Sequence, residues 1–172
     1  MYYPPHADDG PVFLVRRTLH ANVSEEATQR HNLFQSRCKI GDFTCTMIID
    51  SGSCTNVAAK ALVDRLKPPT RPHPRPYKIK WLDNNNTHEV RKQALIALKM
   101  GPYLDNIWCG ILPMTACQLL LGRPWQFDKK AIHDGTLNTY SIQVGQERFT
   151  LLPLPLDSDT SASTNLLTHY AQ

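Results

Sequence analysis

The 172-residue sequence lacks an apolar run long enough to cross a membrane. Its least polar stretch, residues 106–122, has no charge but is interrupted by Gly110, Pro113, Thr115 and Gln118. A spanning helix needs about 20 mainly apolar residues, so we interpret this stretch as buried strands. The first residues also lack the basic start and apolar segment of a secretory signal. We therefore expect a cytoplasmic protein with no membrane partner.

Cysteine patterns typical of disulfide frameworks or metal sites are also missing. The chain has five cysteines, an odd number, and seven histidines. No two cysteines have C-x-x-C spacing, and none has the spacing to histidine that zinc sites use. The sequence therefore predicts free thiols in a reducing compartment, no metal site and no cofactor.

A strong excess of one charge is absent. The 19 Lys and Arg residues stand against 15 Asp and Glu residues, for a formal net charge of +4. Basic and aromatic residues do alternate over residues 71–81, as in some surfaces that bind single-stranded nucleic acid. The modest net charge and the lack of a zinc knuckle make nucleic acid the least favoured partner.

Strand-length apolar runs separated by turn residues are present and predict a mainly β domain over residues 32–153. Runs 33–40 and 43–49 flank the turn pair Gly41-Asp42 and predict a hairpin. A second, longer hairpin is expected from runs 77–82 and 87–100, which reverse at four Asp and Asn residues. Further strands are expected at residues 107–112, 118–121, 137–144 and 148–152.

One or two short helices complete the expected domain. Thr55 can cap a helix that ends near Leu66, because the apolar residues between them follow helical spacing. Residues 124–130 predict another helical turn. The proline-rich, basic residues 65–78 favour an extended, solvated connector. Outside this domain we expect an N-terminal tail with a short strand over residues 1–31 and a flexible C-terminal tail over residues 154–172.

The tripeptide Asp50-Ser51-Gly52 ends an apolar strand. Its glycine permits a tight turn and close backbone approach, so the turn can present a carboxylate at the surface. The tripeptide alone also fits an ordinary strand-to-helix turn in which Asp50 is a local cap. However, the apolar Leu119-Leu120-Leu121-Gly122 follows, with Gly122 lying 72 residues after Asp50. The long hairpin falls between the two segments.

This order of segments resembles the retropepsins, the single-lobe aspartic proteases of retroviruses and long-terminal-repeat retrotransposons. The resemblance covers about residues 32–153. Residues 48–54, 73–77 and 120–128 are also similar to the protease region of gypsy-class, plant-type retrotransposon polyproteins. The resemblance implies a closed β barrel that is active as a two-fold homodimer, with residues 77–100 forming a flap over the substrate.

An aspartic endopeptidase that cleaves peptide bonds of a polyprotein, including its own, is the activity that the resemblance implies. Its chemistry needs one ionised carboxylate to activate water and one protonated carboxyl group to hydrogen-bond the substrate carbonyl. The chain has a single Asp-Ser-Gly, so we expect the second carboxylate from another copy, which makes a homodimer necessary. The resemblance assigns catalysis to Asp50, Ser51 and Gly52, and substrate binding to Trp81, Leu82, Asp83, Asn84, Asn85, Asn86, Leu121 and Gly122.

Two departures from the retroviral pattern accompany this resemblance. No glycine occurs between Gly52 and Gly101, although retroviral flaps are usually rich in glycine. Cys54 occupies the position where many retroviral members carry an acid that pairs with the arginine corresponding to Arg123. The alternative hypothesis is a non-catalytic module, decayed or domesticated, that keeps the fold and only dimerises or binds peptide.

Overall fold

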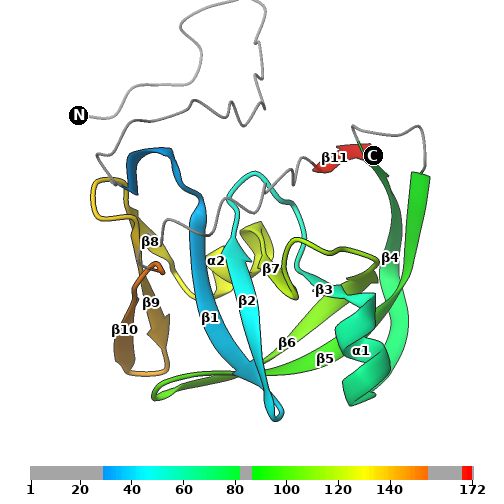
Figure 1. Ribbon diagram of the computed structural model, residues 1–172, viewed down its shortest axis with the longest axis horizontal. Coiled ribbons are helices and arrows are strands. Elements are labelled where there is room, and N and C mark those ends of the chain that lie inside the picture. Colours follow the sequence, from blue (N-terminus) through cyan, green and yellow to red (C-terminus); the bar gives the residue numbers. More distant parts are fainter. Residues whose placement is uncertain (1–28, 82–86, 155–167, 172) are drawn as a thin grey trace, which may run out of the picture.

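The computed structural model in Figure 1 describes residues 29–81, 87–154 and 168–171. In these ranges β-strands predominate over two short α-helices and one 3-10 turn, Gln29–His31, which confirms the mainly β class predicted from the sequence. The strands are β1 Phe34–Ile40, β2 Phe43–Ile49, β3 Val57–Ala59, β4 Thr70–Trp81, β5 Thr87–Met100, β6 Tyr103–Leu112, β7 Leu119–Leu121, β8 Ile132–Asp134, β9 Thr139–Val144, β10 Glu147–Leu151 and β11 Thr168–Ala171.

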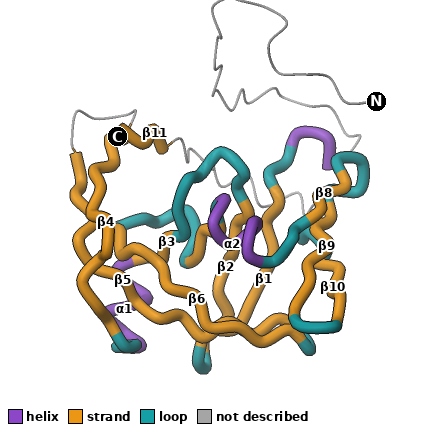
Figure 2. The backbone as a smooth tube through the Cα atoms, turned by 180° about the vertical axis from the view of Figure 1, so that it is seen from behind, coloured by secondary structure: helices purple, strands orange, loops and turns teal. Residues whose placement is uncertain are grey.

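Eight of these strands form one mixed sheet in the order β1-β2-β7-β3-β6-β5-β4-β11. Strand β1 pairs in addition with the end of β5, at Lys39 with Lys99 and at Ile40 with Leu98, so the sheet curves round upon itself. A second, three-stranded sheet has the order β10-β9-β8. Figure 2 shows α2 near the middle of the molecule and α1 toward the end that β4 and β5 form.

The predicted first hairpin is confirmed. Strands β1 and β2 pair from Phe34 with Ile49 to Ile40 with Phe43, and Gly41 turns between them with φ of +60°. This left-handed conformation is readily available to glycine. Alternate residues of β1 are buried, as the apolar pattern requires of a strand with one face on the core.

The second hairpin is longer than predicted because β4 starts within the proline-rich segment. Strand β4 pairs with β5 at both ends, but the register shifts between Pro72 and Tyr77. Prolines have no N–H to donate to a ladder, so the prolines in this stretch are accommodated at an irregularity. On β5 the inward face is formed by Val90, Ala94, Ile96 and Leu98, which are buried.

The helix predicted from Thr55 is wrong in its first half. Val57–Ala59 forms strand β3, and α1 comprises only Lys60–Leu66. All three residues of β3 are buried between β6 and β7, and a short apolar run that is buried on both faces carries no period to distinguish it from a helix. The predicted end at Leu66 is confirmed, with Lys67 in the left-handed conformation after it.

Helix α2, Arg123–Asp128, overlaps the helical turn predicted over residues 124–130 and has proline in its first turn. The three exposed residues of β8 were not predicted as a strand, because they show no apolar alternation. Strand β11 lies in the tail that the sequence predicts to be flexible, and its backbone pairs with β4. The α-helices in the described part of the chain have seven and six residues, well below the length that could span a bilayer.

Candidate active site

Two chain segments far apart in the sequence meet where β2 and β7 end. These strands run parallel, with Ile48 opposite Leu120 and Ile49 opposite Leu121. The backbone N–H of Asp50 donates to the Leu121 carbonyl oxygen at 3.0 Å. Because parallel strands end at the same edge of a sheet, Asp50 and Gly122 follow them side by side. The structure thus brings Asp50, Ser51, Gly52, Leu121 and Gly122 together.

The carboxylate of Asp50 is half-buried and lies in a tight turn. Its Oδ1 accepts a hydrogen bond of 2.8 Å from the Gly52 N–H, and its carbonyl oxygen accepts one of 3.1 Å from the Ser53 N–H. A Cβ at position 52 would lie 3.1 Å from Oδ1, which is tighter than ordinary contact. Glycine therefore lets the backbone close on the carboxylate, which remains open to solvent on its other side.

Two buried polar side chains support Ser51, and sequence reasoning missed both as part of the site. The Ser51 hydroxyl donates to Oε1 of Gln126 on α2 at 2.9 Å. Tyr140 on β9 also lies against this turn. Burial raises the pKa of Tyr140, the charge of Asp50 raises it further, and a hydrogen bond with Ser51 lowers it. The sequence could have indicated Gln126 as a site residue, because it lies within the motif at residues 120–128. Nothing in the sequence near Tyr140 indicates that it belongs to the site.

Gln126 is only 5% exposed, yet its Nε2 has no hydrogen-bond partner among the described residues. A buried polar atom without a partner costs free energy, about 1–3 kcal/mol. The amide is therefore held in place at a cost to stability, next to the turn that carries Asp50. Such local costs are typical of functional positions.

Gly122 locks the second segment against the first. Its N–H donates to Oδ1 of the buried Asn56 at 3.0 Å, and the Arg123 N–H donates to the Ser53 carbonyl at 2.8 Å. A Cβ at position 122 would overlap the carbonyl oxygens of Thr55 and Ser53. Only glycine allows this approach of two backbones. The contact holds the loop after Asp50 against the start of α2.

The base of the β4–β5 hairpin, to which the resemblance assigns the flap, is tied to the same loop. The hydroxyl groups of Thr55 and of Tyr77 on β4 are 3.1 Å apart, within hydrogen-bond distance. Trp81 is the last residue of β4. The other predicted flap residues, Leu82, Asp83, Asn84, Asn85 and Asn86, lie outside the described residues.

The cysteines are all free thiols, as predicted. Cys54 beside the turn is exposed and the other four are buried. Burial raises the pKa of Cys38 and Cys117 to about 12, so these thiols stay protonated and are poor nucleophiles. Among the described residues, no group of three or more His, Cys, Asp or Glu side chains is placed to hold a metal ion.

Residues 46–139, more than half of the chain, match the family model of the PEG10/RTL1 protease domain. The chain belongs to this family. The matched part of the PEG10/RTL1 protease domain runs from β2 into β9, so it contains the Asp50 turn, the flap hairpin, Gly122 and α2. No curated protein sequence matches the chain.

Solved structures that resemble the chain include the retroviral protease-like domain of Ddi1 from Leishmania major. It has a TM-score of 0.52 and 13% sequence identity, over 72% of this chain and 94% of that one. The EIAV protease in complex with an inhibitor has a TM-score of 0.38 and 17% identity, over 64% and 93% of the two chains. A Legionella pneumophila protein of unknown function has a TM-score of 0.35 and 13% identity, over 55% and 84%. The first similarity agrees with the fold class predicted from the sequence.

Proposed function

We propose that the protein is an aspartic endopeptidase of the retropepsin type, whose protease domain spans residues 32–153. The observation that carries this proposal is the placement of Asp50-Ser51-Gly52 at the end of β2, beside Gly122 at the end of β7. Membership of the PEG10/RTL1 protease domain family supports it. The gypsy-class, plant-type likeness of residues 48–54 suggests that the substrate is a retrotransposon polyprotein processed in the cytoplasm or in transposon particles.

Catalysis would require two copies of the chain. A single carboxylate can serve as base or as acid, but activation of water and protonation of the substrate carbonyl need one of each at the same time. We infer that Asp50 of a second copy, related by a two-fold axis, supplies the other group. Two carboxylates a few ångströms apart cannot both ionise cheaply, so the pair would share one proton and favour mildly acidic pH.

The remaining residues of the turn would position these groups. Gly52 leaves room for an extended substrate and offers its carbonyl oxygen to it, while the Ser51 hydroxyl holds the turn through Gln126. The flap hairpin, anchored at Tyr77, would close over the peptide and exclude bulk water. The water would attack the peptide carbonyl directly, which gives a tetrahedral intermediate without a covalent bond to the enzyme.

A dimerisation or peptide-binding module without catalysis is the second candidate. One observation favours it: the Ser51 hydroxyl already donates its hydrogen to Gln126 within its own chain, so it cannot donate the same hydrogen to a second copy. A module of this kind would fold and bind peptide but would not depend on Asp50.

The test is cleavage of a denatured protein mixture between pH 4 and 7, with pepstatin as inhibitor. We expect the wild type to cut and Asp50→Asn to lose at least about a hundredfold in rate, as removal of an acid–base group does. Asp42→Asn is the matched control, because Asp42 is an exposed carboxylate in the β1–β2 turn. If the wild type is inert although folded and dimeric, or if Asp50→Asn cuts as well as Asp42→Asn, the catalytic proposal is wrong.

A further inference from the structure

The charge of the chain is divided unevenly between its parts. The described residues include 17 of the 19 Lys and Arg residues but only eight of the 15 Asp and Glu residues. The described residues therefore carry a formal excess of nine positive charges, more than twice the value for the whole chain. An excess of this size creates a field that attracts polyanions.

Most of this positive charge lies on three neighbouring strands. Strand β5 pairs with both β4 and β1. Together the three strands carry nine Lys and Arg residues but a single acid, Glu89, which pairs with Arg91 at 2.7 Å. No other described ion pair involves these strands. The nine basic residues are Arg37, Lys39, Arg71, Arg75, Lys78, Lys80, Arg91, Lys92 and Lys99.

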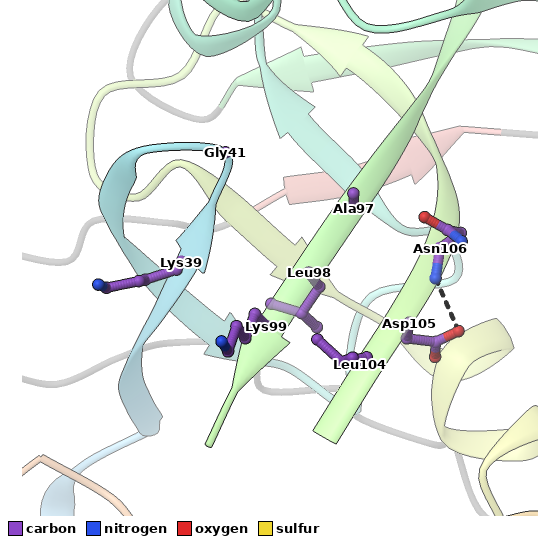
Figure 3. Close-up of a pocket in the computed structure, with 8 residues that line it drawn as sticks. All are labelled: Lys39, Gly41, Ala97, Leu98, Lys99, Leu104, Asp105 and Asn106. Atoms are coloured by element: carbon purple, nitrogen blue, oxygen red, sulfur yellow. Dashed lines mark hydrogen bonds between the residues drawn. The ribbon is translucent and has the colours of Figure 1, made fainter. Parts of the chain in front are cut away.

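Two of these lysines are directly opposite each other. Lys39 of β1 and Lys99 of β5 are register partners, and like charges in such pairs destabilise a sheet. Both line a surface hollow of about 690 Å³, shown in Figure 3, within the volume range of ligand sites. The carboxylate of Asp105 in this hollow is already paired with Lys129 at 2.7 Å and accepts from the Tyr103 hydroxyl at 2.6 Å. The two lysines thus lack a compensating acid among the described ion pairs.

An aromatic ring lies among the cations. Trp108 of β6 is half-buried and pairs with Leu95 of β5. The Arg71 guanidinium lies 3.9 Å from the centroid of the Trp108 ring, and Arg71 Nε donates to Gln93 Oε1 at 2.9 Å. These two contacts hold the Arg71 guanidinium over the ring, in an arrangement on which a nucleobase can stack.

We propose that this surface, the basic strip formed by Lys39, Arg71, Arg91, Lys99 and Trp108, binds a single-stranded nucleic acid. From Arg91 to Lys99 the strip follows β5 for about 26 Å, at about 3.3 Å per residue. Its cations would contact phosphates and its Arg71–Trp108 pair would stack with a base. This length suits about four nucleotides, the lower end of site sizes for such surfaces.

The end of the basic strip that Lys39 and Lys99 form is remote from the candidate active site. Lys39 lies next to the Gly41 turn, which joins β1 to β2 at the end of the hairpin remote from Asp50. Binding of nucleic acid would therefore leave the carboxylate turn open. It would hold the domain on a nucleic acid while the site works on peptide, and it does not depend on the proposed catalysis.

The test is fluorescence anisotropy of labelled 12-nucleotide single strands of RNA and DNA with the full chain, at 50 to 200 mM salt. We expect binding of both that weakens with salt, at a logarithmic slope of about −0.7 for each phosphate contact. Lys39→Ala/Lys99→Ala should weaken binding at least tenfold. The charge-matched control Lys60→Ala/Arg148→Ala, on α1 and β10, should weaken it less than twofold. Circular dichroism confirms that each variant is folded.

Stacking is tested separately through the fluorescence of Trp108. Addition of the single strand should quench tryptophan emission in the wild type, and the quenching should be reduced in Trp108→Phe. The proposal is overturned if no binding occurs at 50 mM salt or if both lysine pairs weaken binding equally. It is also overturned if a polyglutamate peptide binds as tightly as RNA without any change in tryptophan emission, since the surface would then accept any acidic chain.

Discussion

At the residue scale, position 122 has no room for a side chain. A methyl group there would overlap two backbone carbonyl oxygens, those of Thr55 and Ser53, and backbone cannot move aside as a flexible side chain can. We predict that Gly122→Ala lowers the free energy of unfolding by about 3 kcal/mol, as overpacking does. Urea denaturation followed by circular dichroism measures this change.

Gly135→Ala is the matched control, because no atom lies within 4 Å of a Cβ built at Gly135. Its effect should stay within about 0.5 kcal/mol, as for surface substitutions in general. Equal stability of the two variants would contradict the tight approach between Gly122 and the loop at residues 53–55.

A substitution of Gln126 should affect stability and activity differently. In Gln126→Met the unpartnered buried Nε2 is removed, so the free energy of unfolding should stay the same or rise by about 1 kcal/mol. The same change removes the acceptor of the Ser51 hydroxyl, and loss of one hydrogen bond, about 1 kcal/mol, should lower kcat/KM about fivefold. Kinetics and urea denaturation on the same preparation test both parts.

Ser51→Ala provides the control for this interpretation. It should reduce kcat/KM by a similar factor, and the double variant should be no worse than either single one, because both remove the same contact. Additive losses would mean that Gln126 acts on activity by a route other than Ser51.

At the scale of elements, the end of α1 carries a strained residue. Lys67 has φ of 46° and its N–H donates to the Val63 carbonyl at 2.8 Å. A residue with a side chain pays about 1–2 kcal/mol in this conformation, and glycine pays less there but loses more entropy on folding. We predict that Lys67→Gly raises the free energy of unfolding by up to about 1 kcal/mol.

Ala61→Gly is the matched control within the same helix. Ala61 is exposed in the first turn of α1, where glycine costs up to about 1 kcal/mol relative to alanine. Thermal or urea denaturation should therefore give shifts of opposite sign for the two glycines. A loss of stability in both would show that Lys67 is not strained.

The elements also show what the sequence could reveal. The β1–β2 hairpin was predictable because one face alternates and Gly41 marks the turn between them. Strand β3 was not, because its three apolar residues continue the helical spacing of α1. The Asp50 turn was predicted from its motif. The support of Ser51 by Gln126 and Tyr140 depends instead on how α2 and β9 lie against the turn after β2, which no local pattern encodes.

At the scale of the whole molecule, the net charge of the full sequence does not show how unevenly its charges are distributed along the chain. Seven of the 15 acids lie outside the described residues, so the sum over all 172 positions is smaller than the sum over the described ones. The positions of the strands were needed to reveal that nine cations and one acid share three adjacent strands. Sequence reasoning ranks nucleic acid last among partners because the net charge of the whole chain is modest and a zinc knuckle is lacking.

The proposed need for two chains yields the last prediction. If each active site needs Asp50 from both copies, random pairing of equal amounts of wild type and Asp50→Asn leaves about a quarter of the dimers with two wild-type chains. After co-refolding at a fixed total concentration, cleavage should thus fall to about a quarter of the all-wild-type rate. A mixture with the Asp42→Asn control should keep the full rate. A fall to only half would mean that each wild-type chain works alone, because half of the chains would then still be active whatever their partner.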